Sequence, residues 1–95
     1  MNTFNFVKRS PIEINKLIAA RIRDIRKRKK ISQEKLSEKS GVSLGSVKRF
    51  ESSGEISLIS LTKIAIALNC ENELERLFED TPFESIDEVI NGQGK

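Results

Sequence analysis

The 95-residue sequence predicts an all-α fold, and three features of the chain lead to this prediction. Apolar residues recur at steps of three and four over long segments, which is the spacing of one face of an α-helix. Serine residues precede several of these segments, where they can cap a helix N-terminus, and a glycine separates two of them. A chain of this length forms one small domain with a modest core.

The first predicted helix covers residues 11–29. It starts at Ser10-Pro11-Ile12-Glu13, which combines a serine cap, a proline at the first helical position and a glutamate that completes a capping box. The side chains expected on its inner face are Ile14, Leu17, Ile18, Ile22 and Ile25. The arm that precedes it, residues 1–10, alternates weakly at Phe4 and Phe6 and fits a short strand, a flexible arm or a partner-binding segment.

Residues 32–51 predict two short helices joined by a tight turn. Ser32 can cap the first helix and leaves Gln33 at its first position, with the amide free near the exposed backbone N–H groups. Gly41 tolerates the positive φ angle that a sharp corner between helices requires. Ser43 is a natural cap for the second helix.

The second of these helices has one inward and one outward face. Val47 and Phe50 lie three residues apart and are expected to point into the core. The residues left to face outward or to flank that face are Leu44, Gly45, Ser46, Lys48 and Arg49. This outward face is small, polar and cationic.

Two further helices are predicted after a loop at residues 55–57. The first follows the sequence SLISLTKIAIALN, and its core candidates are Leu58 or Ile59, with Leu61, Ile64, Ala65 and Leu68. The second covers residues 71–79 and carries an apolar stripe formed by Leu74, Leu77 and Phe78. Residues 82–90 follow another capping-box sequence and predict a short, mildly amphipathic helix.

The pattern SQEKLSEKSGVS followed by SVKRFE resembles the helix-turn-helix of the lambda-repressor-like (Cro/C1-type, XRE) family of DNA-binding proteins. The resemblance covers about residues 16–78. A glutamine at the start of one helix, a glycine turn, a serine cap and a glutamate at the end of the next helix occur together at the family's spacing. The resemblance implies a compact five-helix DNA-binding domain over residues 11–79, with the motif at 32–51, a short N-terminal arm (1–10) and an acidic C-terminal extension (80–95).

In this family the helix after the turn lies in the DNA major groove, with its N-terminal residues at the base edges. The resemblance therefore implies base readout by Leu44, Gly45, Ser46, Lys48 and Arg49. Arg49 is the strongest of these candidates, because arginine can donate two hydrogen bonds to guanine. Gly45 departs from the polar residue often found at its position, so direct readout is expected to be sparse and DNA shape to contribute more.

Two further sets of roles come with the resemblance. Gln33 and Ser43, at the starts of the two motif helices, are expected to contact phosphates. Arg26 and Glu51 match a family pair that forms a partly buried ion pair and ties the first helix to the third. The alternative is that Arg26 and Glu51 are two unrelated surface charges. The loop at residues 55–57 departs from the commonest family spacing by about one residue, so no DNA contacts are assigned to it.

The charge of the chain is unevenly distributed. From Lys8 to Arg49 there are 14 Lys and Arg against 4 Asp and Glu, whereas from Glu71 to Lys95 there are 2 against 8. A concentrated positive surface is what a protein needs to neutralise phosphates, since counterion release supplies most of the sequence-independent affinity for DNA. The alternative is that these charges form only solvated helix faces.

Several classes of function are not expected. The sequence has no histidine, one cysteine (Cys70) and no glycine-rich phosphate loop, so we predict no enzyme activity, no metal site and no cofactor. No apolar run approaches the roughly 20 residues of a membrane helix. The start of the chain lacks the apolar core of a signal peptide, and a single cysteine allows no internal disulfide, so a reducing cytoplasm is the expected location.

We therefore expect a sequence-specific regulator of transcription, a repressor that binds double-stranded DNA at an inverted repeat as a homodimer. The dimer interface candidates are Leu74, Leu77 and Phe78, which could instead only cover the five-helix core. The alternative function is an antitoxin similar to that of HipB/HipA pairs, with a protein partner bound through the N-terminal arm or the C-terminal tail. The tail residues to suspect in that case are Phe83, Ile86 and Val89.

Overall fold

The computed structural model describes residues 8–80 of the chain, and that part is all-helical. Its helices in chain order are α1 (Pro11–Arg28), α2 (Gln33–Ser40), α3 (Leu44–Ser53), α4 (Leu58–Ala67) and α5 (Glu71–Glu75). The all-α, five-helix prediction is confirmed. The predicted helix at residues 82–90 and the alternation at Phe4 and Phe6 lie outside the described residues.

The helices α1 to α4 begin at serine residues that cap them, whereas α5 has no side-chain cap. At α1, the Ser10 N–H donates to Glu13 Oε1 over 2.7 Å, and the Glu13 N–H donates to Ser10 Oγ over 3.1 Å, which is the predicted capping box. The hydroxyl of Ser32 caps α2 and that of Ser43 caps α3. Ser57 caps α4 in the same way, by accepting the Ser60 N–H. Side chains thus satisfy N–H groups that have no partner within the helix.

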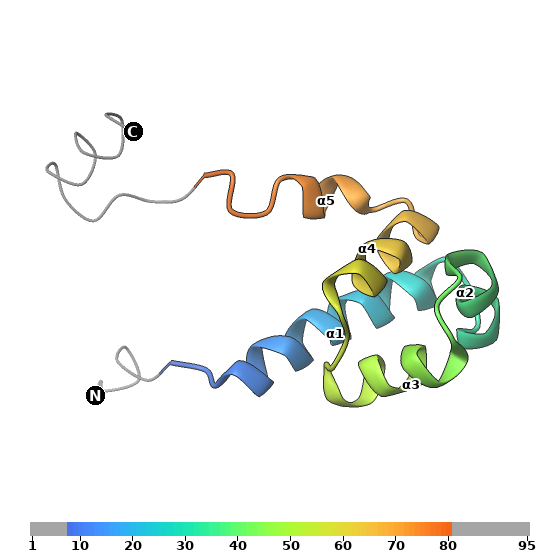
Figure 1. Cartoon of the computed structure of the whole chain (residues 1–95), viewed down its shortest axis with the longest axis horizontal. Coiled ribbons are helices and arrows are strands. Elements are labelled where there is room, and N and C mark those ends of the chain that lie inside the picture. Colours follow the sequence, from blue (N-terminus) through green and yellow to red (C-terminus); the bar gives the residue numbers. More distant parts are fainter. Residues whose placement is uncertain (1–7, 81–95) are drawn as a thin grey trace, which may run out of the picture.

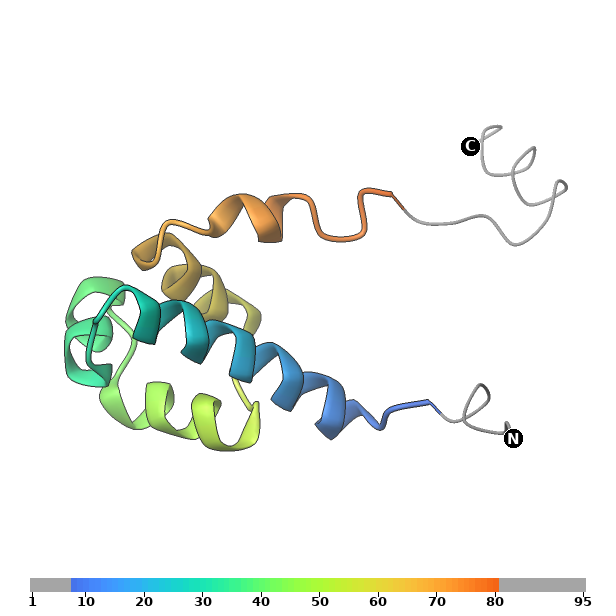
Figure 2. The same ribbon diagram turned by 180° about the vertical axis from the view of Figure 1, so that it is seen from behind.

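The core lies among α1, α2, α3 and α4, and α5 contributes no buried residue to it. Figures 1 and 2 show α1 crossing the molecule, with α2 and α3 to one side of it and α4 and α5 to the other. The largest fully buried side chains are Phe50, Leu36, Ile64, Leu68 and Val47. Because Val47 and Phe50 belong to α3, the core fixes the orientation of that helix, as the sequence predicts.

Two glycines determine the corners of the motif. Gly41 ends α2 with a φ of 77°, and Gly54 ends α3 with a φ of 84°, both in the left-handed region that other residues rarely adopt. Gly54 also lies against α1, since a Cβ atom built on it would fall 2.8 Å from the Asn15 carbonyl carbon. The α3–α1 contact at this point therefore depends on the absence of a side chain.

The prediction of the buried face of α1 was wrong in the N-terminal half of the helix. Ile22 is buried, but Ile14 and Ile18 are 46% and 37% exposed, and the fully covered residue in this region is Ala19. With 18 residues, α1 is longer than α3 and α4, which have 10 residues each. A helix of that length, about 27 Å, extends past its shorter neighbours and leaves its first turns partly uncovered.

Neither Leu58 nor Ile59 belongs to the core, and this prediction was also wrong. They are 68% and 65% exposed at the start of α4. The buried face of that helix instead begins at Leu61, which is half-buried, and continues through Ile64, Ala65 and Leu68. This i, i+3, i+4, i+7 spacing is one side of a helix, and Leu58 and Ile59 lie in the turn before it.

The last helix is shorter than predicted. It ends at Glu75 rather than at residue 79, and the chain continues in turns, with N–H groups of Leu77 and Glu79 bonded to carbonyls three residues earlier. Phe78 adopts a φ of 64°, which a continuing helix cannot contain. Leu77 and Phe78 consequently stand 52% and 79% exposed.

Candidate nucleic-acid interface

The outward face of α3 is the first part of the candidate interface. Because Val47 and Phe50 are buried, the residues between them turn away from the core. Gly45, Lys48 and Arg49 are exposed, and Leu44 and Ser46 are half-buried. All five residues predicted for base readout therefore lie on or beside one side of α3, four of them with a side chain and Gly45 with none.

The start of α3 carries two linked hydroxyls. Ser43 Oγ accepts the Ser46 N–H at 3.1 Å, and the Ser43 hydroxyl donates to Ser46 Oγ at 2.9 Å. With that donation made, the hydrogen of the Ser46 hydroxyl is free to donate outward. The two residues form a polar group at the N-terminus of the helix, where backbone N–H groups and the helix dipole favour an anion.

Arg26 and Glu51 form an ion pair that joins α1 to α3. Arg26 Nε donates to Glu51 Oε2 over 2.6 Å and a terminal guanidinium nitrogen donates to Oε1 over 2.9 Å, and the two side chains are only 9% and 5% exposed. The remaining terminal nitrogen donates to the Ile31 carbonyl oxygen over 2.7 Å. One guanidinium thus fixes α3 and the turn that leads into α2.

The ionisation of this pair follows from its contacts. Burial raises the pKa of Glu51, but hydrogen bonds from Arg26 and Gln33, with the charges of Arg26 and Arg23, more than offset burial and lower it below its usual 4.5. The hydrogen bond to Glu51 raises the pKa of Arg26, against the opposing effect of burial. Both groups remain charged near neutral pH.

Gln33 belongs to the same network. The sequence predicts a free amide at this position, but Gln33 Nε2 donates to Glu51 Oε1 over 3.0 Å. This difference arises because Glu51, 18 residues later in the chain, is carried to the start of α2 by the packing of α3. The amide retains a second hydrogen, which can donate to a phosphate oxygen. Glu51 therefore holds Gln33 in place at the α2 N-terminus.

The described cations of α3 are available to a partner. Within residues 8–80 the ion pairs are Arg26–Glu51, Lys35–Glu38 and Arg76–Glu79. Lys48 and Arg49 belong to none of them. An exposed arginine without a carboxylate partner breaks no ion pair when it binds DNA.

The residues predicted to form the dimer interface lie in α5 and in the turns that follow it. Leu74 is half-buried, and Leu77 and Phe78 are exposed. They are not brought together with the α3 face. Among the helices within residues 8–80, none is long and apolar enough to cross a membrane.

A short helix, a glycine corner and a second helix held by the core with a polar, cationic face outward define a DNA-binding helix-turn-helix domain. In agreement, a protein-family model described as Helix-turn-helix matches residues 22–71. The chain belongs to this XRE, or lambda-repressor-like, family and is a DNA-binding regulator of transcription. Searches of curated proteins and of solved structures gave no match.

Sequence reasoning missed two contacts in this site. The Gln33–Glu51 hydrogen bond depends on the packing of α3 beside the start of α2. The Arg26 bond to the Ile31 carbonyl is local and spans five residues across the turn after α1. The signal that could indicate them is the pair Arg26 and Glu51 itself, since a buried guanidinium needs acceptors for more donors than one carboxylate can satisfy.

Proposed function

We propose that this protein is a repressor that binds an inverted repeat as a homodimer, with α3 reading the bases of each half-site. The observation that carries the proposal is the outward face of α3, where Lys48 and Arg49 are exposed on a helix fixed by buried Val47 and Phe50. A rigid helix that presents donors at regular spacing can place them at base edges in the major groove.

Arg49 carries most of the proposed base specificity. It can bond guanine O6 and N7 with two donors, which corresponds to about 1–3 kcal/mol of discrimination against another base. Leu44 can pack against a thymine methyl group, whereas Gly45 offers only backbone. The sparse side chains at the start of α3 imply that sequence-dependent DNA shape contributes to specificity.

Gln33 and Ser43 are proposed to position the domain on the DNA backbone. Both lie at helix N-termini, at the start of α2 and immediately before α3, where backbone N–H groups and the helix dipole favour a phosphate. The Ser43 hydroxyl donates to Ser46 Oγ in the free domain, so Ser43 exchanges that bond for the phosphate on binding. Contacts of this kind set the register of the protein on the duplex and carry no sequence information.

The proposed dimer contact uses the exposed side chains after α5. Leu77 and Phe78 present large apolar groups to solvent, beside half-buried Leu74. A two-fold dimer through this region would carry two copies of α3, which suits half-sites one helical turn apart. If the chain is instead monomeric at micromolar concentration, the antitoxin alternative is favoured, with a protein partner bound through the N-terminal arm or the C-terminal tail.

An anisotropy titration tests the proposal. The full chain is titrated into labelled DNA from immediately upstream of its own gene, and into random duplex of equal length, at two salt concentrations. The proposal predicts a large preference for the upstream DNA and a footprint with two-fold symmetry. Equal binding to both duplexes would contradict self-regulation, and no binding to either at low salt would contradict the DNA-reading role of α3.

A further inference from the structure

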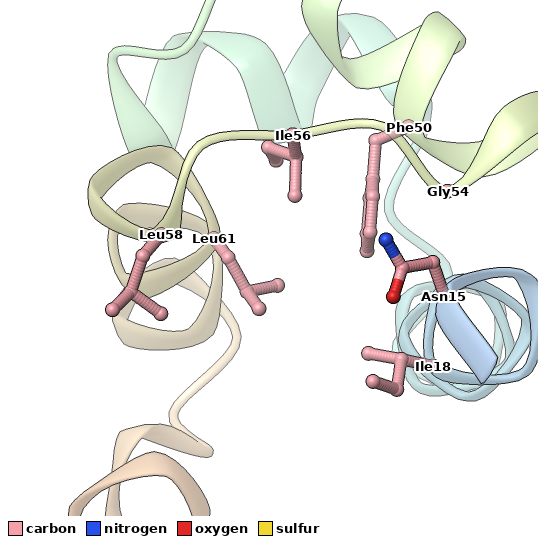
Figure 3. A pocket seen from close by; sticks show the side chains of 7 residues that line it. All are labelled: Asn15, Ile18, Phe50, Gly54, Ile56, Leu58 and Leu61. Carbon is pink, nitrogen blue, oxygen red and sulfur yellow. The ribbon is translucent and has the colours of Figure 1, made fainter. Parts of the chain in front are cut away.

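An apolar pocket opens between α1 and α4, on a different part of the molecule from the outward face of α3. It has a volume of about 180 Å³ and is lined by Asn15, Ile18, Phe50, Gly54, Ile56, Leu58 and Leu61. In Figure 3, Ile56 and Phe50 lie along the top of the pocket, Leu58 and Leu61 of α4 on one side, and Asn15 and Ile18 of α1 on the other. Phe50 itself is only 1% exposed, so the apolar surface open to solvent in the pocket comes from partly buried residues that pack against the core, such as Ile56 and Leu61.

The rim of the pocket is also apolar. Ile18 and Leu58, which line it, are 37% and 68% exposed, and Ile14 lies one turn before Ile18 on the same side of α1 with 46% exposure. Large apolar side chains gathered around an open pocket indicate a surface that another segment covers. The last described helix does not line the pocket, since none of the lining residues belongs to α5.

The chain leaves the described region on the side of this pocket. Figures 1 and 2 both show residues 71–80 running from the end of α4 toward the side of the molecule at which α1 begins. Fifteen residues follow Asp80. An extended segment of that length reaches roughly 50 Å, far more than the width of a small domain, so these residues can return to the pocket.

The sequence of this tail suits the pocket. Phe83, Ile86 and Val89 are spaced three residues apart, and the acidic residues that interleave with them are Glu84, Asp87 and Glu88. Such a pattern gives one apolar and one acidic side to a helical segment. The α1 surface beside the pocket is basic, with Lys16 next to Asn15 and Arg21 one turn after Ile18, both exposed. The acids near this surface are Glu13, which is hydrogen-bonded in the α1 cap, and Glu55.

We propose that residues 82–90 dock into the pocket between α1 and α4 of the same molecule, with Phe83, Ile86 and Val89 against Ile18 and Leu58. The N-terminal arm is a poorer occupant, because residues 1–7 contain no acidic side chain and lead into Lys8 and Arg9. Docking of the tail covers the apolar lining of the pocket and stabilises the domain. It does not depend on DNA binding, and it leaves the outward face of α3 uncovered.

A double-mutant cycle in the full chain tests this inference. The variants are Leu58→Ser, Phe83→Ser and their combination, with urea unfolding as the measurement. The matched control is Ile66→Ser, a substitution of another exposed α4 side chain (54%) that does not line the pocket. Each of the first two substitutions is expected to lower the urea midpoint by roughly 0.5–1 M, as loss of one buried apolar side chain predicts.

The combination decides the result. If Phe83 packs against Leu58, the double variant unfolds at about the midpoint of the weaker single variant, and Ile66→Ser unfolds like the wild type. An unchanged midpoint for Phe83→Ser, or fully additive losses in the double variant, would overturn the proposal. A wild-type midpoint that rises with protein concentration, together with loss of the coupling on dilution, would also overturn it and assign the pocket to a second copy of the chain.

Discussion

At the scale of single residues, Glu51 is the centre of the site. It accepts hydrogen bonds from Arg26 and from Gln33, and so connects a structural ion pair to a proposed phosphate contact. Arginine and glutamate at this depth stabilise the fold only as a pair, because removal of one partner leaves a buried charge. The same side chain therefore affects stability and the position of Gln33.

Glu51→Gln is predicted to destabilise the domain by about 3 kcal/mol at pH 7, since it leaves the Arg26 guanidinium without a carboxylate. The pH dependence has a defined sign. The pKa of Glu51 is lowered in the folded protein, so its contribution is fully present above the unfolded value of about 4.5 and is lost as pH falls through the folded pKa.

Urea unfolding of both proteins between pH 7 and pH 2.5 checks this prediction. The stability difference between wild type and Glu51→Gln is expected to be constant from pH 7 to about pH 5 and to shrink below pH 4.5, as the wild-type carboxylate becomes protonated. A difference that stays constant down to pH 2.5 would mean that the charge of Glu51 does not stabilise the fold.

Gln33→Ala is expected to weaken binding to every DNA sequence by a similar factor and to leave base preference unchanged, because phosphate contacts carry no sequence information. The loss of one hydrogen bond to a charged phosphate corresponds to about 1.5–3 kcal/mol, or roughly 10- to 150-fold in Kd. Competition binding with a cognate and a random duplex measures both constants. A loss confined to the cognate duplex would assign Gln33 to base readout instead.

At the scale of secondary-structure elements, the two glycines of the α3 region have opposite roles. Gly45 lies within the helix and Gly54 is its C-cap. Gly54 adopts a φ of 84° and lies against α1, whereas an added Cβ on Gly45 would meet no atom within 4 Å. Gly54 is thus required by the backbone and the packing. Nothing within the described structure requires Gly45, and it lies on the face proposed to meet DNA.

Gly54→Ala is predicted to destabilise the domain by about 1–3 kcal/mol, from the strained φ and the contact with Asn15. Gly45→Ala is its control and is expected to stabilise the domain by roughly 0.5–1 kcal/mol, since alanine favours the helix. Thermal unfolding of the two variants measures the contrast. If both substitutions changed the stability equally and with the same sign, the roles assigned to Gly54 and Gly45 would be wrong.

The exposed Phe78 in the turns after α5 allows a test of the proposed dimer interface. Phe78→Ser is expected to raise the dimer dissociation constant by about 10- to 100-fold, if the side chain is buried in the interface as proposed. Ile12→Ser, at another exposed isoleucine (64%), is the control and should leave dimerisation unchanged. Sedimentation equilibrium measures both. An unchanged dimer in the Phe78 variant would place the interface elsewhere.

At the scale of the whole molecule, local sequence signals predicted the fold well. The caps at Ser10, Ser32 and Ser43 and the corner at Gly41 form as expected, because each depends on residues within four positions of it. The order of the five helices follows from these signals. The α3 face was also predictable, since Val47 and Phe50 define its buried side.

Burial at the ends of helices was not predictable in the same way. Ile14, Ile18 and Leu58 have the spacing of core residues, but whether they are covered depends on where neighbouring helices end in space. The Gln33–Glu51 hydrogen bond likewise needs α2 and α3 to be placed relative to each other. A periodic pattern indicates which side of a helix is apolar, and the tertiary arrangement determines how much of that side is buried.

The central claim is that the outward face of α3 reads DNA sequence, and the most direct test is the base preference of Arg49→Ala. Wild type and variant are compared by competition binding against a set of operator duplexes, each with one base pair substituted. We predict that the variant binds the operator about 10-fold more weakly or worse and loses discrimination at one base pair per half-site, with preference at other positions retained. An unchanged preference at every position would contradict the claim.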